Sequence, residues 1–268
     1  MQAIKHIGNV TWTKDEIKES IPGFLELYKN RPLKDNDGGM LSPHMFATWF
    51  MLKKLNPLNV IESGVWKGQG TWLIENTLPD ANVFSIDIAL NLRQYISKKV
   101  KYFDQDFKLI DWSMIDNKEQ TVIFFDDHQN ALQRLIDAKK LGFRHFIFED
   151  NYSAQHGDCY TLKKAFQHAG YKANYGVGFK AKIKELLYSG KVNIKPNSED
   201  SDYLQQLLDV YYEFPPVFKK DKTRWGLKWD EENYSTPDPL YTEIEKEYLK
   251  IFENEATDYN WICYAKIK

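Results

Sequence analysis

Cysteine is scarce in this chain of 268 residues, which contains Cys159 and Cys263 and no other. Two distant thiols exclude a disulfide framework, and they do not have the spacing of a structural zinc site. We therefore expect the protein in a reducing compartment, of which the cytoplasm is the simplest.

Long apolar runs are also missing from the sequence. Residues 45–52 form one of the longest, and a run of that length is far too short to span a bilayer. Residues 1–10 lack the apolar core of a signal peptide. We therefore expect no membrane partner.

Neither sign of charge is in excess. The 36 Lys and Arg residues oppose 38 Asp and Glu residues, which gives a formal charge of −2. The sequence has no run of basic residues that would follow a phosphate backbone. This balance argues against nucleic acid as the main partner.

Apolar residues make up 43% of the chain, which is enough for one large core. Short apolar runs alternate with segments of helical pattern. The expected strands are 59–62, 82–88, 100–103, 121–125 and 144–148, and the expected helices between them are 71–77, 90–99 and 129–140. This alternation is typical of a parallel sheet buried on both faces, so we predict an α/β fold with a doubly wound, mainly parallel sheet.

Other segments flank or follow this alternating region. We expect four parts: a helical lead-in at 1–57, the core at 58–152, an inserted cap at 153–240, and a closing segment of the core at 241–268. The lead-in should contain helices over 12–30 and 43–55, and the closing segment a helix over 241–254 and a strand over 261–267. The cap should be helical over 158–169 and irregular over 171–240. The cap is rich in aromatic residues, which suggests a binding surface for an acceptor or for a second copy of the chain.

Most of the expected strands lead directly into acidic residues. The set is Glu62, Asp87, Asp106, Asp126, Asp127, Glu149 and Asp150. Ligands of doubly wound folds bind at the carboxyl ends of the strands, so we expect these side chains to gather along one rim. Any one acid can instead start a loop or cap a helix, but that explanation fits the whole series less well.

A glycine-rich turn follows the first core strand, at residues 62–71 (ESGVWKGQGT). Gly64 and Gly68 let the backbone pass close to a ligand, and the amides that begin the next helix can face a carboxylate or phosphate. The bulky residues 65–67 stand where a bridging pyrophosphate needs small ones, which favours a ligand without bridging phosphates. A purely structural tight turn is the alternative.

Two of the strand-end acids suit a nucleoside. Asp87 can accept hydrogen bonds from both hydroxyls of a ribose, a use that NAD sites and S-adenosylmethionine sites share. Asp106 can accept from an adenine amino group, or it can simply face solvent.

The other acids come from two neighbouring strand ends, at residues 124–128 (FFDDH) and 148–151 (FEDN). Like charges this close raise each other's pKa unless a cation compensates, and carboxylate oxygens suit Mg²⁺. The expected ligands of this cation are Asp126, Asp127, Glu149 and Asp150. The cation would orient a substrate hydroxyl and lower its pKa, with His128 as the general base and Asp127 beside it as a second candidate catalytic residue. Metal-free binding by these acids, and a capping role for His128, are the alternatives.

Residues 62–70 (ESGVWKGQG) resemble the first motif of the macrocin-type sugar O-methyltransferases and of the related cephalosporin-hydroxylase-like group. There an acid precedes Gly-Val-Trp, a basic residue and Gly-Gly; here Gln69 separates the last two glycines. An Asp after the fourth strand and an acidic pair after the fifth hold magnesium in those families, as residues 126–127 and 149–150 would here. Catechol-type O-methyltransferases have similar Asp-His and Asp-Asn pairs, and the resemblance covers about residues 58–152.

The resemblance implies a class I S-adenosylmethionine-dependent methyltransferase with a Rossmann-like sheet of the seven-stranded type. The donor is then expected to contact Glu62, Gly64, Val65, Trp66, Gly68, Asp87, Asp106 and Asp126. We expect O-methylation of a small polar or sugar-type acceptor, in carbohydrate or natural-product assembly. Five cations of the expected cap could meet a phosphate or an acidic sugar, or could simply form a solvated charged face: Lys182, Lys184, Lys219, Lys220 and Arg224.

Three other functions stay open at this point. A nicotinamide-dependent oxidoreductase acting on a sugar nucleotide would share the fold and Asp87, but residues 65–67 and the lack of a Tyr-x-x-x-Lys pair beside the sheet count against it. A non-catalytic protein that binds the cofactor or a partner is the second. A metal-dependent hydrolase is the third, although it would normally use more His ligands than six scattered histidines provide.

Overall fold

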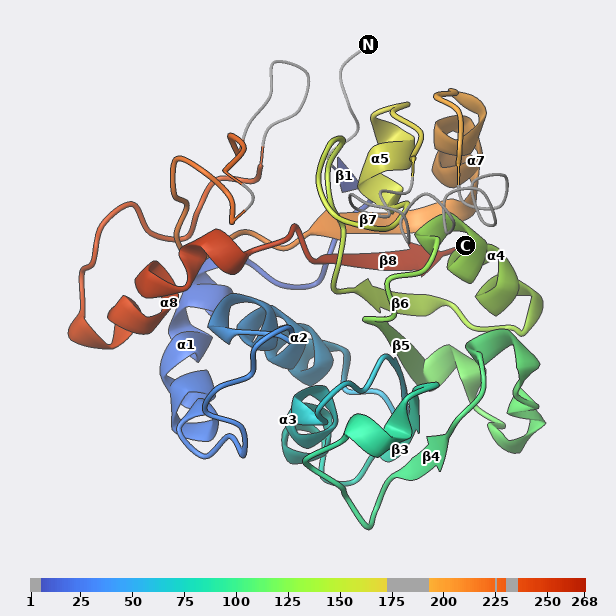
Figure 1. Ribbon diagram of the computed structural model, residues 1–268, viewed down its shortest axis with the longest axis horizontal. Helices are drawn as coiled ribbons and strands as arrows, with labels where there is room; N and C mark the ends of the chain where they lie inside the picture. Colours follow the sequence, from blue (N-terminus) through green and yellow to red (C-terminus); the bar gives the residue numbers. More distant parts are fainter. Residues whose placement is uncertain (1–5, 173–192, 225, 230–235) are drawn as a thin grey trace, which may run out of the picture.

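The computed structural model describes residues 6–172, 193–224, 226–229 and 236–268 (Figure 1). Eight strands form one sheet in the order β1-β7-β8-β6-β5-β2-β3-β4. The strands are β1 (His6–Ile7), β2 (Asn59–Ser63), β3 (Asn82–Ile86), β4 (Lys101–Phe103), β5 (Thr121–Phe125), β6 (His145–Phe148), β7 (Leu208–Glu213) and β8 (Cys263–Ile267).

The strands from β4 to β6 are parallel, and their order reverses between β2 and β5. The chain runs outward from β2 through β3 to β4, and then returns to place β5 and β6 on the other side of β2. β8 is antiparallel to both β6 and β7, and β1 is antiparallel to β7. The predicted fold class, a doubly wound and mainly parallel sheet, is confirmed.

Helices cover both faces of this sheet (Figure 1). The α-helices are α1 (Lys14–Tyr28), α2 (Ser42–Leu55), α3 (Gln69–Thr77), α4 (Ala131–Lys140), α5 (Leu162–Phe166), α7 (Glu199–Leu207) and α8 (Lys250–Asn254). Short 3-10 turns are η1 (Leu90–Leu92), η2 (Phe107–Leu109), η3 (Trp112–Met114), η4 (Lys118–Gln120), η5 (Glu247–Leu249) and η6 (Ala256–Asp258).

Alternate side chains of the central strands enter two separate cores. Val122 and Phe124 of β5 pack with α1, α2, α3 and α8, whereas Ile123 and Phe125 pack with α4, α5 and α7. This follows from the period of two in a strand, which sends successive side chains to opposite faces. Strand β5 is therefore buried along its whole length and reads as a continuous apolar run.

Helix α2 has the largest number of buried residues among the helices that the structure describes, eleven of its fourteen. Pro43 stands in its first turn, where the missing N–H costs nothing, and Asn56 ends it in the left-handed conformation with φ of 42°. In the first turn of α2, His44 contacts Glu149, which follows β6, and Asn260, which precedes β8. These contacts place the beginning of α2 beside the site described below.

The predicted helix over residues 90–99 is wrong. Only the turn η1 forms, and the amides of Gln94 and Tyr95 both donate to the carbonyl of Lys67 instead of continuing a helix. The apolar residues Leu92 and Ile96 of this segment are 45% and 61% exposed, so they do not form the buried face of a helix. This segment therefore folds back onto the glycine-rich turn.

The expectation of irregular structure over 171–240 is wrong for residues 199–213. They form α7 and β7, and β7 lies inside the main sheet between β8 and β1. The helices expected at 158–169 and 241–254 are confirmed only for 162–166 and 250–254. Among the described residues, no helix is both long and apolar enough to cross a membrane.

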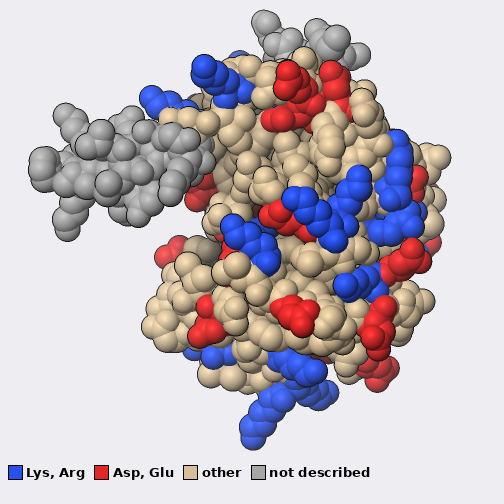
Figure 2. All heavy atoms as spheres, turned by 90° about the vertical axis from the view of Figure 1, so that its right-hand side faces the viewer, with Lys and Arg blue, Asp and Glu red and all other residues tan. Residues whose placement is uncertain are grey.

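Acidic and basic side chains are interspersed on the face of the molecule that carries α4 (Figure 2). Among the residues that are coloured on that face, the basic side chains have acidic ones between them (Figure 2).

Candidate functional site

A cleft of about 720 Å³ lies at the carboxyl ends of β2, β3 and β5, where the strand order reverses. Residues of four predicted strand-end positions line it: Asp87, Asp106, Asp126 and Asp127. Gly64, Trp66, His128 and Arg134 complete much of its wall. The cleft is therefore at the place where ligands bind in doubly wound folds.

Glycine is required at two positions of the turn that forms the cleft floor. Gly64 has a φ of +101°, and a Cβ there would overlap the carbonyl oxygen of Asp126. Gly68 has a φ of +93° at the start of α3, and a Cβ would overlap the carbonyl of Tyr95. Close backbone approach between β2 and β5 thus explains the first glycine, and the folded-back segment explains the second.

Asp87, which directly follows β3, stabilises this turn through hydrogen bonds. Its Oδ2 accepts the amides of Val65 and Trp66, each at 2.9 Å, and its Oδ1 accepts the amide of Ala89 at 2.8 Å. The amides of Val65 and Trp66 are therefore directed at a carboxylate of the protein itself. Asp87 remains on the cleft wall, and its expected role as a ribose acceptor stays a prediction.

Glu62 lies beneath the cleft and does not line it. It is fully buried, and its Oε2 accepts the hydroxyls of Thr71 and Ser85, both at 2.5 Å. Burial raises the pKa of Glu62 to about 7, although these two hydrogen bonds act in the opposite direction. Its visible contacts join β2, β3 and α3, so a direct contact with the donor stays a prediction.

Arg134 of α4 forms ion pairs with two of the strand-end acids. Its guanidinium donates to both oxygens of Asp106, at 3.0 and 2.9 Å, and its Nη2 lies 2.8 Å from Oδ2 of Asp127. The Ser63 hydroxyl also donates to Asp127 at 2.7 Å. The hydrogen bonds from Arg134 lower the pKa of Asp106. Asp127 therefore faces Arg134, and the sequence offered no sign of this residue.

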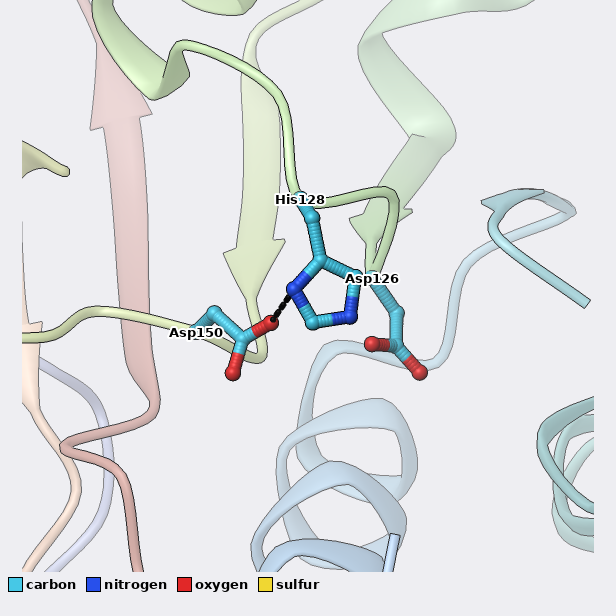
Figure 3. A group of neighbouring side chains, drawn as sticks. All are labelled: Asp126, His128 and Asp150. Atoms are coloured by element: carbon cyan, nitrogen blue, oxygen red, sulfur yellow. Dashed lines mark ion pairs between the residues drawn. The ribbon is translucent and has the colours of Figure 1, made fainter. Parts of the chain in front are cut away.

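Asp126, His128 and Asp150 come together at the ends of β5 and β6. One ligand atom from each lies within 4.8 Å of the others, and Figure 3 shows the His128 ring between the two carboxyl groups. Burial raises the pKa of Asp126 well above its ordinary value, and the charges of Glu149 and Asp150 raise it further. The group contains Asp126 and Asp150, two of the four expected ligands, and metal binding by it stays a prediction.

His128 lies between two acidic side chains that favour its protonated form. Its Nδ1 lies 3.0 Å from Oδ2 of Asp150 and 3.0 Å from Oδ1 of Asp158, with the hydrogen bond directed to Asp158. These two partners raise the pKa of His128 to about 12. A protonated ring cannot accept a second proton. The expected role of His128 as general base therefore requires that a bound cation first neutralise the carboxylate of Asp150.

Glu149 is buried beside this group, and burial and the charge of Asp150 raise its pKa. Its Oε1 contacts Nδ1 of His44, a residue of α2 that sequence reasoning did not select. The Nε2 of His44 accepts the amide of Asn260 at 2.7 Å, and burial lowers the pKa of His44 to about 4. The ring is therefore neutral, with its proton on Nδ1.

The cations expected to meet an acidic acceptor are only partly within the described structure. Lys182 and Lys184 lie outside the described residues. Lys219 is half-buried, and Lys220 forms an ion pair with Glu253. The Nη1 of Arg224 lies 3.8 Å from Oδ1 of Asp258, and the charge of Arg224 counteracts the rise in the pKa of Glu149. Arg224 is thus the cation of this set with an electrostatic effect on the acid group.

No family model and no curated protein matches the chain. Among solved structures, the CmcI apo-structure matches at 20% identity and a TM-score of 0.34, over 41% of this chain and 52% of that chain. The match thus spans about half the length of that structure.

Two other solved structures give similar results. The plantazolicin methyltransferase BpumL, in complex with a pentazolic desmethylPZN analog and SAH, matches over 96% of this chain and 99% of that chain, at 13% identity and a TM-score of 0.41. A putative caffeoyl-CoA O-methyltransferase from Staphylococcus aureus matches over 50% and 72%, at 14% identity and a TM-score of 0.36. The chain is similar to these proteins, while its fold class rests on the strand order and pairing above.

Proposed function

We propose that this protein is an S-adenosylmethionine-dependent O-methyltransferase that acts on a small polar acceptor with the help of a divalent cation. The observation that carries the proposal is the charge of the cleft. Four carboxyl groups line it, and the basic side chains among its described lining residues, Arg134 and His128, are each already paired with acids.

This charge distribution suits S-adenosylmethionine better than NAD. The sulfonium of S-adenosylmethionine is positive, so it gains from an acidic wall. The pyrophosphate of NAD carries two negative charges, and the amides of Val65 and Trp66 that could bind it are taken by Asp87. The same two facts count against the nicotinamide-dependent alternative.

The proposed donor site uses the residues around the switch in strand order. The ribose would lie against Asp87 and the adenine near Asp106, with the methyl group directed toward Asp126. The acceptor oxygen then attacks the methyl carbon while the carbon–sulfur bond breaks, and S-adenosylhomocysteine leaves. The hydroxyl proton goes to a base, for which His128 is the candidate once Asp150 is neutralised. Positioning supplies much of the catalysis.

The residues at the ends of β5 and β6 fit a divalent cation. Asp126, Glu149 and Asp150 are three buried or partly buried carboxyl groups whose mutual repulsion an ion would relieve, and oxygen ligands of this kind suit Mg²⁺. A bound Mg²⁺ would lower the pKa of the acceptor hydroxyl. We assign the ligand role to Asp126, because Asp127 is occupied by Arg134 and Ser63.

The acceptor belongs to the same proposal. Arg224 acts electrostatically on Glu149, so an acceptor with a phosphate or acidic sugar group could be anchored beside the acids. Residues 153–240 would supply the acceptor surface, in a homo-oligomer or a monomer. A role in carbohydrate assembly and a cytoplasmic location also belong to the proposal.

Transfer of a labelled methyl group from S-adenosylmethionine to a panel of hydroxylated and phosphorylated sugars tests this function. We expect label in a product with Mg²⁺ and none with chelator. Glu149→Gln should bind the donor normally and lose the metal-dependent transfer, whereas the exposed control Glu247→Gln should behave as wild type. Transfer that is unaffected by chelator would contradict the metal assignment, and failure to bind the donor would contradict the whole proposal.

A further inference from the structure

We propose that His44 is a positioning residue that holds the carboxyl group of Glu149 in place for a divalent cation. This inference rests on the proposed function, since it assigns a role at the same acidic site. Its basis is the set of contacts that His44 makes between three distant segments of the chain.

His44 stands where α2 meets the ends of two strands. It lies in the first turn of α2 with 2% of its surface exposed, Glu149 directly follows β6, and Asn260 shortly precedes β8. The ring edge also packs against the ring of Tyr259, with centroids 5.6 Å apart and planes at 85°. The amide of Ser42 donates to the carboxylate of Glu255 at 2.8 Å, which fixes the beginning of the same helix.

The direction of both hydrogen bonds follows from one observation. The amide of Asn260 can only donate, so the Nε2 of His44 must be the acceptor of that 2.7 Å bond. The proton of the neutral ring is then on Nδ1, and Nδ1 donates it to Oε1 of Glu149. One side of the ring sets the tautomer, and the other side presents an N–H to the acid.

The carboxyl group that receives this N–H needs to be held. Glu149 is 6% exposed, and the charges of Asp150 and Glu149 raise the pKa values of Glu149 and Asp126, respectively. A side chain of this length has several rotamers, and repulsion from two neighbouring acids favours those that turn away. A fixed donor on one oxygen keeps the group among the other two acids, as outer-shell donors do for metal-ligating carboxylates.

A purely structural role would require only that His44 join α2 to the rest of the fold. The bond to Asn260 is sufficient for that role, whereas the bond to Glu149 is the one directed at the acid group. Two amide variants separate these contacts. In His44→Asn the side-chain amide reaches the position of Nδ1 and can donate to Glu149. In His44→Gln it reaches the position of Nε2 and can accept from Asn260.

The experiment is calorimetric titration of the full chain with Mg²⁺ in the presence of S-adenosylhomocysteine, together with the thermal midpoint of the metal-free protein. We expect His44→Gln to bind Mg²⁺ about 10- to 100-fold more weakly. His44→Asn should stay within about threefold of wild type, because it keeps the outer-shell donor to Glu149. Tyr259→Phe, which removes a nearby hydroxyl bonded to Phe214, should lower the midpoint without changing Mg²⁺ affinity.

Wild-type Mg²⁺ affinity in His44→Gln would overturn the role of His44 and leave the proposed function intact. Absence of Mg²⁺ binding in the wild type would overturn both, and the wild-type titration alone reveals it. If a variant does not fold, nitrogen-15 histidine NMR of the wild type provides the same decision. We expect the His44 proton on Nδ1 and a shift of that resonance when Mg²⁺ is added, and an unchanged resonance would contradict the role.

Discussion

At the scale of single residues, Glu62 shows how burial changes the chemistry of an acid. It is fully buried, and burial raises its pKa to about 7 from 4.5. The folded protein therefore holds a proton that the unfolded chain releases between these values. Its contribution to the free energy of unfolding is greatest at low pH and is lost as pH rises from about 4.5 to about 7.

The Glu62→Gln variant should remove this pH dependence. Between about pH 5 and pH 8, the wild-type free energy of unfolding should fall by roughly 2–3 kcal/mol more than that of the variant. Gln keeps an oxygen for the hydroxyls of Thr71 and Ser85, so the fold is retained. Urea unfolding at both pH values measures the difference. Equal pH dependence in the two proteins would mean that Glu62 titrates normally.

Asp87 is expected to be essential for donor binding. Asp87→Ala removes the ribose acceptor and frees the amides of Val65 and Trp66, so affinity for S-adenosylmethionine should fall at least about 100-fold. Asp104→Ala removes an exposed acid in the loop after β4 and serves as the charge-matched control. Normal donor binding by Asp87→Ala would place the donor elsewhere.

The sequence was sufficient to place four of the seven strand-end acids at the cleft, but not their partners. Asp87, Asp106, Asp126 and Asp127 were predicted at one rim because parallel strands end on the same side of a sheet. Arg134 and His44 were not predicted, because they lie far in sequence from the acids that they contact. Arg134 is 28 residues from Asp106, and His44 is 105 residues from Glu149. No local pattern records such contacts. The same reason explains why Asp127, rather than Asp126, turned out to face Arg134.

At the scale of structural elements, the turn between β2 and α3 depends on Gly64. Gly64→Ala forces a side chain into a φ of +101° and into the carbonyl of Asp126. We expect a loss of about 2–4 kcal/mol in the free energy of unfolding and weaker donor binding. Gly23→Ala in α1 is the control, since its Cβ would meet only Trp49 at 3.7 Å and should leave stability unchanged or raised. Similar effects of the two changes would contradict the close approach of β2 and β5.

A buried ion pair joins α5 to β7. Lys163 Nζ lies 3.0 Å from Oε2 of Glu213, both side chains are almost completely buried, and the Tyr211 hydroxyl donates to the same carboxylate. Lys163→Met leaves a charge buried without this partner and should cost about 3–5 kcal/mol of unfolding free energy.

The double variant Lys163→Met/Glu213→Gln removes both charges and should recover most of that loss. Chemical denaturation of the two proteins provides the comparison. If the single and double variants are equally destabilised, the loss comes from packing and not from the isolated carboxylate.

The elements were predictable where local pattern and tertiary environment agreed. β5 was predicted to the residue, because burial on both faces makes it apolar throughout. The helix over 90–99 failed because its amides bond to Lys67, a contact that apolar spacing does not reveal. β7 was missed because it adds to the sheet after a long excursion and mixes buried with exposed positions.

At the scale of the whole molecule, the sheet brings acids from β3, β4, β5 and β6 to one edge and leaves few cations to balance them. The order reversal between β2 and β5 opens the cleft, where Arg134 pairs with Asp106 in the wall and His128 pairs with Asp150 beside it. The fold class followed from the alternation of strands and helices. The sign of the cleft's charge could be determined only from the structure, because it depends on which cationic side chains the fold directs into the cleft.

The measurement that tests the central claim most directly is calorimetric titration with S-adenosylmethionine, S-adenosylhomocysteine and NAD, each with Mg²⁺ and with chelator. We predict micromolar binding of the two adenosyl ligands and no binding of NAD, because the acidic cleft repels a pyrophosphate. Binding of NAD alone, or of none of the three, would contradict the methyltransferase proposal and would leave the strand-end acids to be explained by another ligand.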